Sequence, residues 1–217
     1  MSDDPETVRQ IAALSMDTRP LLVLDVDEVV LEFLAPFTRY LDHRGYGFQS
    51  ESFRLHGNVV ETATGTAAAA DTVSGLLDDF FAAQEDWQTP AAGVSAALDR
   101  LSGLAEIVML TAMPHAHRER RRTLLDRLGI PFPLVTTEKA KGPAVALLAG
   151  ERTAPVAFVD DIPHNHASVQ KHFPRAGLFH LMAHEGMRRL LPPLPPGVVE
   201  TRDWADASAK LAAALAV

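Results

Sequence analysis

Two carboxylates stand one residue apart directly after a short apolar run: Asp25 and Asp27 follow residues 21–24, which read LLVL. A continuous run of branched apolar residues is typical of a strand that is buried on both faces, as in parallel sheets. Side chains two positions apart on a strand point the same way, and open α/β sheets bind ligands at the carboxyl ends of their strands. Like charges held this close repel each other unless a cation or a shared proton lies between them. The stretch therefore predicts a metal site, an acid–nucleophile pair, or both.

Two later apolar runs also end in polar side chains. Residues 107–110 lead into Thr111, and residues 156–159 lead into Asp160 and Asp161. Because the carboxyl ends of parallel strands lie at one edge of a sheet, we expect these acids and this hydroxyl to converge there.

Two lysines lie between those runs, shortly before a predicted helix. We favour Lys141 as an ammonium at the same sheet edge, because the helix begins immediately after it at Gly142-Pro143. Lys139 remains the alternative.

The elements that must position these residues follow from hydrophobic periodicity. Alternating strand and helix patterns predict an α/β fold built on a doubly wound parallel sheet. We expect strands at 21–24, 107–110, 134–135, 156–159 and 177–182. We expect helices within 1–19 and at 93–101, 117–128, 144–148, 164–172 and 204–215.

Residues 32–89 interrupt this alternation directly after the acidic strand end. We expect them to form an inserted, mainly helical module with a hairpin that turns at Gly57-Asn58. The predicted domains are a core of residues 1–31 and 90–217 and an inserted module of residues 32–89.

Composition narrows the class of protein. The chain has 217 residues, 47% of them hydrophobic, a formal net charge of −8 and no cysteine. The negative charge argues against nucleic acid or an anionic membrane as the main partner, and the missing cysteines exclude thiolate metal sites. No apolar run approaches the roughly 18 residues that span a bilayer. The acidic start lacks the pattern of a signal peptide, so we expect a cytoplasmic protein.

The order of these motifs resembles the haloacid dehalogenase-like (HAD) superfamily of phosphohydrolases. Its members have an apolar strand followed by D-x-D-x-[TV], which here spans residues 25–29, and then a strand that ends in Ser or Thr. A lysine near a helix start and a strand that ends in paired acids complete the pattern. The resemblance covers most of the chain outside residues 32–89. It implies a Rossmann-like core with those residues as a cap over the active site.

The resemblance also implies roles for the acids. Asp25 would attack phosphorus and form an aspartyl-phosphate, while Asp27 would protonate the leaving alkoxide and then activate water. Mg²⁺ would be held by Asp25, the main-chain carbonyl of Asp27 and Asp160, with Asp161 as a further or water-mediated ligand. The second acid favours phosphoryl transfer over carbon–halogen cleavage, because a halide leaving group needs no proton.

In the same pattern, Thr111 would donate a hydrogen bond to a phosphoryl oxygen, and Lys141 would neutralise charge in the transition state. The expected function is that of a Mg²⁺-dependent phosphatase acting on a small phosphorylated metabolite. Phosphotransfer to an acceptor other than water is a close variant, and a non-catalytic binding or regulatory protein with the same fold is the alternative. A receiver domain is contradicted, because its Thr and Lys follow its phosphorylated acid.

Several residues leave two interpretations open. Glu28 stands where the family often has a small residue; it either points away from the site or lies at the pocket mouth and disfavours anionic leaving groups. The pairs His115/His117 and His164/His166 invite a zinc site, although helix-surface roles are favoured and His164 is a candidate for substrate contact. The arginine-rich run at 118–122 is expected to form a solvated helix face.

Overall fold

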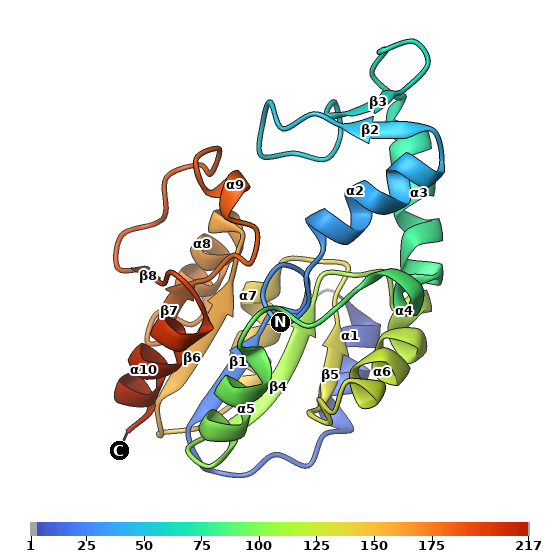
Figure 1. Ribbon diagram of the computed structural model, residues 1–217. Coiled ribbons are helices and arrows are strands. Elements are labelled where there is room, and N and C mark those ends of the chain that lie inside the picture. Colours follow the sequence, from blue (N-terminus) through green and yellow to red (C-terminus); the bar gives the residue numbers. More distant parts are fainter. Residues whose placement is uncertain (1–3, 217) are drawn as a thin grey trace.

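The computed structural model describes residues 4–216, which fold around a six-stranded sheet ordered β5-β4-β1-β6-β7-β8 (Figure 1). All neighbouring strands pair in parallel. The strands of this sheet are β1 (Leu21–Leu24), β4 (Glu106–Thr111), β5 (Leu134–Thr136), β6 (Val156–Asp160), β7 (Gly177–His180) and β8 (Val199–Glu200). β1 is central, and the chain winds outward from it first through β4 and β5 and then through β6 to β8.

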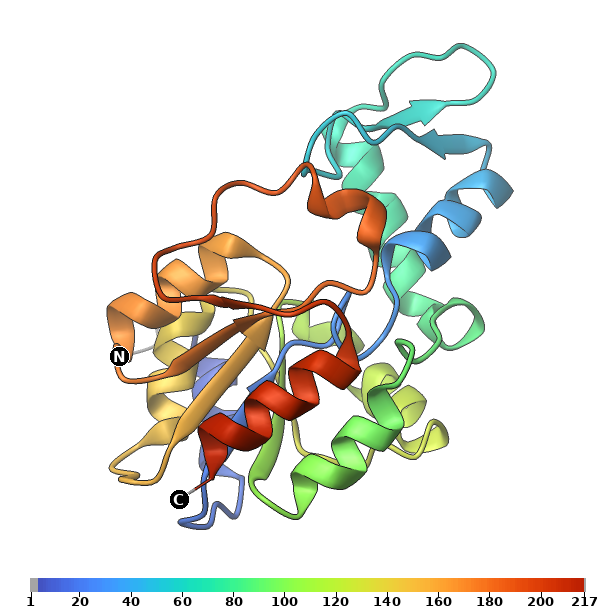
Figure 2. The same cartoon turned by 60° about the vertical axis from the view of Figure 1, so that its left-hand side comes forward.

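Helices cover both faces of the sheet (Figures 1 and 2). They are α1 (Pro5–Ala12), α5 (Val94–Ser102), α6 (Arg118–Arg127), α7 (Lys141–Ala149), α8 (Pro163–His172) and α10 (Trp204–Leu215). Strand residues alternate between the two faces: Leu22 and Leu24 pack with α5, α6 and α10, whereas Leu21 and Val23 pack with α1, α7 and α8. The predicted doubly wound parallel α/β sheet is therefore confirmed.

Two local features lock elements beside the sheet. A side chain at Gly142 would place its Cβ 2.2 Å from the carbonyl oxygen of Ser168, so only glycine lets α7 and α8 approach this closely. Asp4 caps the N-terminus of α1 and accepts a hydrogen bond from the main chain of Glu138. Burial opposes ionisation of Asp4, but hydrogen bonds from the N–H groups of Glu138 and Thr7 outweigh it and hold the pKa of Asp4 well below its usual range.

The chain between β1 and α5 forms a separate small unit beyond the carboxyl ends of the strands (Figure 1). Its elements are α2 (Leu34–His43), β2 (Tyr46–Phe48), β3 (Val59–Glu61), α3 (Ala70–Ala82) and α4 (Gln84–Trp87). The rings of Phe37, Tyr40 and Phe80 form its core, with centroids 5.3 to 5.6 Å from Phe80. Entering and leaving segments pair at Leu31 and Pro90, beside the predicted domain boundaries, which stay a prediction.

The sequence located most elements to within a few residues, but it misplaced the hairpin. β2 pairs antiparallel with β3, and a ten-residue loop, 49–58, joins them. Gly57 and Asn58 thus do not join the two strands in a two-residue turn. They lie in a turn at the end of that loop, where the main-chain N–H of Asn58 donates to the carbonyl of Leu55, and the Asn58 amide donates hydrogen bonds to the carbonyls of Ser52 and Arg54 and fastens the loop. The two-residue strand β8 and the short helix α9 (Glu185–Arg188) were not predicted.

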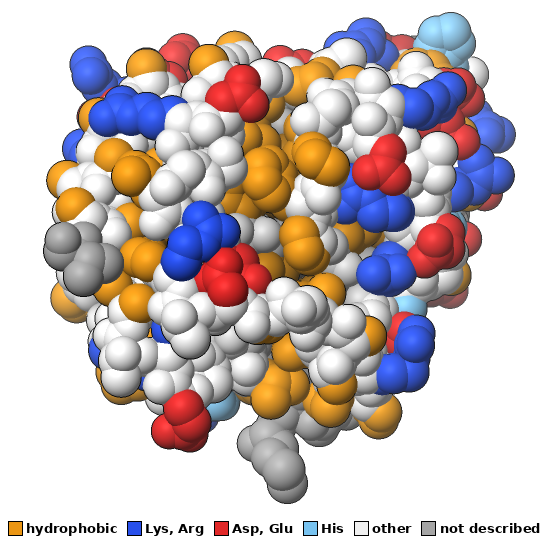
Figure 3. All heavy atoms as spheres, turned by 90° about the horizontal axis from the view of Figure 1, so that it is seen from below, with side chains coloured by type: hydrophobic (Ala, Val, Ile, Leu, Met, Phe, Trp, Pro, Cys, Tyr) orange, Lys and Arg blue, Asp and Glu red, His pale blue; other side chains and the backbone are white. Residues whose placement is uncertain are grey.

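Two features of the structure concern possible membrane or nucleic-acid partners: the length of its apolar helices and the charge of its surface. Within residues 4–216, no helix is both long and apolar enough to cross a membrane. On the face shown in Figure 3, acidic and basic side chains are interspersed around a central apolar hollow, and no broad basic patch is visible there.

Candidate active site

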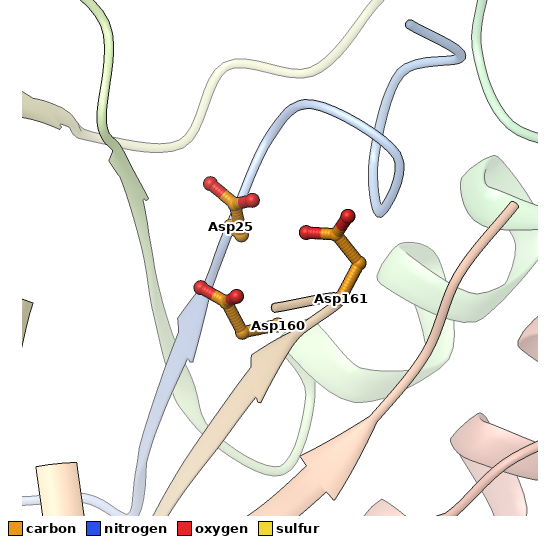
Figure 4. Close-up of side chains that lie close together, drawn as sticks. All are labelled: Asp25, Asp160 and Asp161. Carbon is orange, nitrogen blue, oxygen red and sulfur yellow. The ribbon is translucent and has the colours of Figure 1, made fainter. Parts of the chain in front are cut away.

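Three strand ends bring the predicted acids and hydroxyl to one edge of the sheet. Asp25 directly follows β1, Thr111 is the last residue of β4, and Asp160 is the last residue of β6. Because β1 lies between β4 and β6, these side chains are neighbours at the place where the winding direction reverses. The carboxylates of Asp25, Asp160 and Asp161 face a common space, with one oxygen of each lying within 4.8 Å of the others (Figure 4).

Lys141 supplies the ammonium of this site. Its Nζ lies 2.5 Å from Asp25 Oδ1 and 2.7 Å from Asp160 Oδ2, and the side chain is 1% exposed. Burial alone would lower the pKa of Lys141, but the charges of Asp160 and Asp25 outweigh it and raise the pKa. The alternative residue, Lys139, is exposed. At the start of α7, Lys141 reaches the acids because Gly142 lets that helix lie against α8.

The carboxylate of Asp160 is fully engaged by protein groups. Besides Lys141, it accepts hydrogen bonds from the main chain of Ile162 at 2.8 Å and from the amide of Asn165 at 2.9 Å. These bonds fix the turn from β6 into α8 and hold Asp160 in one orientation.

Two buried histidines support the acid pair from behind. His166 Nε2 donates to the carbonyl of Asp160, and His180 Nε2 donates to the carbonyl of Asp161, each at 3.0 Å. Burial lowers the pKa of both His166 and His180, so the neutral rings act as donors. The expectation of a helix-surface role for His166 is therefore wrong, since its side chain is fully buried.

Asp161 is the acid that protein groups leave incompletely bonded. Its Oδ1 is buried and has no hydrogen-bond partner within residues 4–216. Burial, reinforced by the charges of Asp160 and Asp25, raises the pKa of Asp161 well above its usual range. Burial also raises the pKa of Asp25 to about 7; Lys141 opposes this shift, and Asp160 and Asp27 add to it. Excess negative charge and an unpartnered carboxylate oxygen fit a hard divalent cation such as Mg²⁺.

Asp27 is held by a buried arginine that is not part of the predicted motifs. Arg121 is fully buried and binds both carboxylate oxygens of Asp27, at 3.0 and 3.1 Å. Gln88 donates to Asp27 at 2.8 Å, and the hydroxyl of Thr111 lies 3.4 Å away. Arg121 also donates to the side-chain oxygens of Gln84 and Gln88. Asp27 is thus tied both to α6 and to α4, the last helix before the chain returns to the core.

The prediction of a solvated face for residues 118–122 is wrong at Arg121 and holds only in part at Arg118 and Arg122, which are half-buried and donate to main-chain carbonyls. Arg118 and Arg120 make ion pairs with exposed or partly exposed acids, whereas Arg121 points inward. Three and four residues later come Leu124 and Leu125, both buried. That helical spacing was the available signal, because it places Arg121 on the apolar stripe of α6.

Glu28 has a structural task at the entrance to the inserted unit. It adopts a left-handed backbone conformation with φ 63°, and its carboxylate accepts hydrogen bonds from the main chain of Phe33, Leu34 and His184 at 2.6 to 3.0 Å. Glu28 therefore caps the start of α2 and ties it to the segment after β7. It also lines the cavity described below, so it does not simply point away.

The histidine pairs do not converge on a zinc site. His115 Nε2 contacts Asp4, and His117 Nε2 contacts Asp78. His164 is exposed, while His166 is buried behind Asp160. The acid cluster of Asp25, Asp160 and Asp161 is the arrangement within residues 4–216 whose ligand atoms converge.

A cavity of about 320 Å³ opens above the acids, between the sheet edge and the inserted unit. Its lining includes every predicted site residue except Asp160, which lies beneath it: Asp25, Asp27, Thr111, Lys141 and Asp161. The arrangement places carboxylates, a hydroxyl and an ammonium around one small-molecule space.

Comparison with known proteins identifies the fold. No protein-family model matches the chain, and no curated protein matches its sequence. Among solved structures, a conserved haloacid dehalogenase-like protein of unknown function from Agrobacterium tumefaciens is similar, with a TM-score of 0.58 and 18% identity over 89% of this chain and 97% of that one. A haloacid dehalogenase-like family hydrolase from Streptococcus pneumoniae has a TM-score of 0.57 and 12% identity over 90% and 100%.

A third similar structure is a HAD family hydrolase from Deinococcus radiodurans with bound phosphate and sodium, with a TM-score of 0.57 and 14% identity over 91% and 96%. The chain therefore has the haloacid dehalogenase-like fold.

Proposed function

We propose that this protein is a phosphatase that hydrolyses a small phosphate monoester through an aspartyl-phosphate on Asp25. The observation that supports this most strongly is the contact of Lys141 with Asp25 and Asp160 at the floor of a small cavity. Bound phosphate in the similar Deinococcus radiodurans structure is consistent with this class of substrate.

In this proposal each side chain of the site has a different role. Asp25 attacks phosphorus. Asp27 enters the reaction as the protonated carboxylic acid and gives its proton to the leaving oxygen; the carboxylate so formed later takes a proton from the water that attacks the aspartyl-phosphate and releases phosphate. Thr111 donates a hydrogen bond to the transferring group, and Lys141 balances charge in the transition state. Arg121 positions Asp27 without touching the substrate.

A divalent cation, expected to be Mg²⁺, would be held by Asp25, the main-chain carbonyl of Asp27 and the Asp160–Asp161 pair. Within that pair, Asp161 has the free oxygen, because Asp160 is already bonded to Lys141. When bound, the cation supplies charge that lets an anionic phosphate approach carboxylates and polarises the phosphoryl oxygens. It would also favour the ionised, nucleophilic form of Asp25.

Hydrolysis of a generic aryl phosphate tests the proposal. Turnover is measured with Mg²⁺, with EDTA, and with the variant Asp25→Asn, which keeps the shape of the side chain and removes its nucleophilic charge. We expect turnover that needs Mg²⁺ and is lost in the variant. Lack of metal-dependent turnover above the variant's background, over a broad panel of phosphate esters, would instead favour a non-catalytic protein with this fold.

A further inference from the structure

The cavity above the acids has walls of a different chemical kind from its floor. The floor carries acids and one lysine. The wall from the inserted unit is apolar and consists of Phe33, Leu34, Phe53, Leu55, Leu77 and Phe81. A second, mainly apolar wall comes from the core side and includes Ile162, Met182 and Met187, with Asn165 and His184 as its polar residues. A ligand whose phosphate lies on the floor would therefore place its organic part against hydrocarbon.

Polar groups are scarce on the wall opposite the acids. Arg54 is the one charged residue that the inserted unit contributes to the lining, and it is exposed. The two carboxylate oxygens of Glu28, at the junction, already accept main-chain hydrogen bonds. A sugar or polyol would thus lose water around several hydroxyls and find few partners on these walls, chiefly Arg54 and the unpartnered Nδ1 of His184, which disfavours binding.

We infer that the leaving group is a hydrophobic alcohol, so the substrate is a phosphate monoester with an alkyl or aryl body. This inference rests on the proposed phosphatase function and adds the chemical class of the leaving group. The cavity of about 320 Å³ is at the small end of ligand sites, which suits one compact apolar group.

A homologous series of n-alkyl phosphates from propyl to hexyl tests the inference, because these esters differ in length while their leaving groups have nearly the same basicity. We expect kcat/KM to rise about fourfold with each methylene until the cavity is filled, as apolar burial predicts. Glycerol 3-phosphate, which has the same number of carbons as n-propyl phosphate, should be the poorer substrate of the two.

Binding is measured in parallel with the n-alkylphosphonates of the same lengths, which cannot be hydrolysed. Isothermal titration calorimetry should show the same roughly fourfold gain in affinity per methylene. This readout does not depend on turnover.

Matched variants test whether the apolar wall of the cavity causes the dependence on chain length. Leu77→Asn and Leu55→Asn each place a polar group in the apolar wall, from a helix and a loop respectively, and both residues are partly exposed, so the fold should tolerate either change. Each should flatten the dependence on chain length. Leu104→Asn alters an exposed leucine, 41% accessible, in the turn before β4 at the opposite edge of the sheet, and should leave that dependence unchanged.

The outcomes separate the inference from the function on which it rests. Turnover without a gain along the series, a preference for glycerol 3-phosphate, or an unchanged slope in folded Leu77→Asn and Leu55→Asn overturns the apolar leaving group and leaves the phosphatase intact. Chain-length-dependent binding of the phosphonates without turnover of any ester overturns the phosphatase and retains the apolar site. Neither turnover nor length-dependent binding overturns both.

Discussion

Replacing Arg121 with Met should destabilise the protein far more than the same change one residue earlier. The Arg121 side chain is fully buried, its partner Asp27 is 19% exposed, and their shortest contact is 3.0 Å. At an effective dielectric constant of about 20, two charges at that separation attract by roughly 5 kcal/mol, before the cost of desolvation is subtracted. The substitution also leaves the side-chain oxygens of Gln84 and Gln88 without this donor.

Removing one partner of a buried pair typically costs about 3–5 kcal/mol. Because water reaches part of Asp27, we expect Arg121→Met to lower the free energy of unfolding by about 3 kcal/mol. Arg120→Met is the matched control: Arg120 is 54% exposed and pairs with Glu85 on the surface, so the cost should stay below about 1 kcal/mol.

Urea unfolding followed by circular dichroism measures both changes. If the two variants lose free energy of unfolding by amounts that agree within about 0.5 kcal/mol, the reasoning is refuted. A difference of that size is typical of surface substitutions, so the buried ion pair would contribute no measurable stability of its own.

Three further predictions concern the metal site, pH and helix packing. Without metal at about pH 8, Asp161→Asn should raise Tm, because it removes a buried carboxylate with an unpartnered oxygen. The variant should also lose stabilisation by Mg²⁺. A Tm of the variant below that of wild type in EDTA would contradict this account. Asp4→Asn should destabilise the protein by about 1 kcal/mol near pH 6. A carboxyl whose pKa is lowered in the folded state stabilises that state above the unfolded pKa and loses the effect on acidification. The difference in free energy of unfolding between variant and wild type should therefore shrink below about pH 4. A difference that stays constant between about pH 6 and pH 3 in urea titrations would contradict this role of Asp4. Gly142→Ala should lower the free energy of unfolding by about 1–3 kcal/mol, because it forces α7 away from Ser168. Gly75→Ala lies inside α3 with open space around it and should raise the free energy of unfolding by up to about 1 kcal/mol. Equal effects of the two changes on urea unfolding would show that the close packing at Gly142 does not limit stability.

The sheet and its acidic edge could be predicted because their signals are local. A buried parallel strand is a continuous apolar run, and the residue after it lies at the ligand-binding edge whatever the rest of the chain does. Asp25, Thr111 and Asp160 were found in this way. Lys141 was favoured over Lys139 for a similarly local reason, the start of a helix.

Residues whose roles depend on tertiary contacts could not be assigned from the sequence. Arg121 lies in a run of arginines that are exposed or half-buried, and its burial follows from the side chains of α4 that it meets. His166 is buried by its position behind β6. The hairpin was misplaced because Asn58, a common turn residue, uses its amide to fasten a longer loop.

The central claim is that Asp25 is a nucleophile that carries the phosphoryl group during turnover. The most direct measurement is mass spectrometry of peptides from enzyme that is quenched in acid while it hydrolyses a phosphate ester with Mg²⁺ present. We predict a peptide containing Asp25 that is heavier by one phosphoryl group, with the modification on that carboxylate and absent from the same enzyme treated without substrate. Turnover with no phosphorylated Asp25, or with the phosphoryl group on another side chain, would contradict the account.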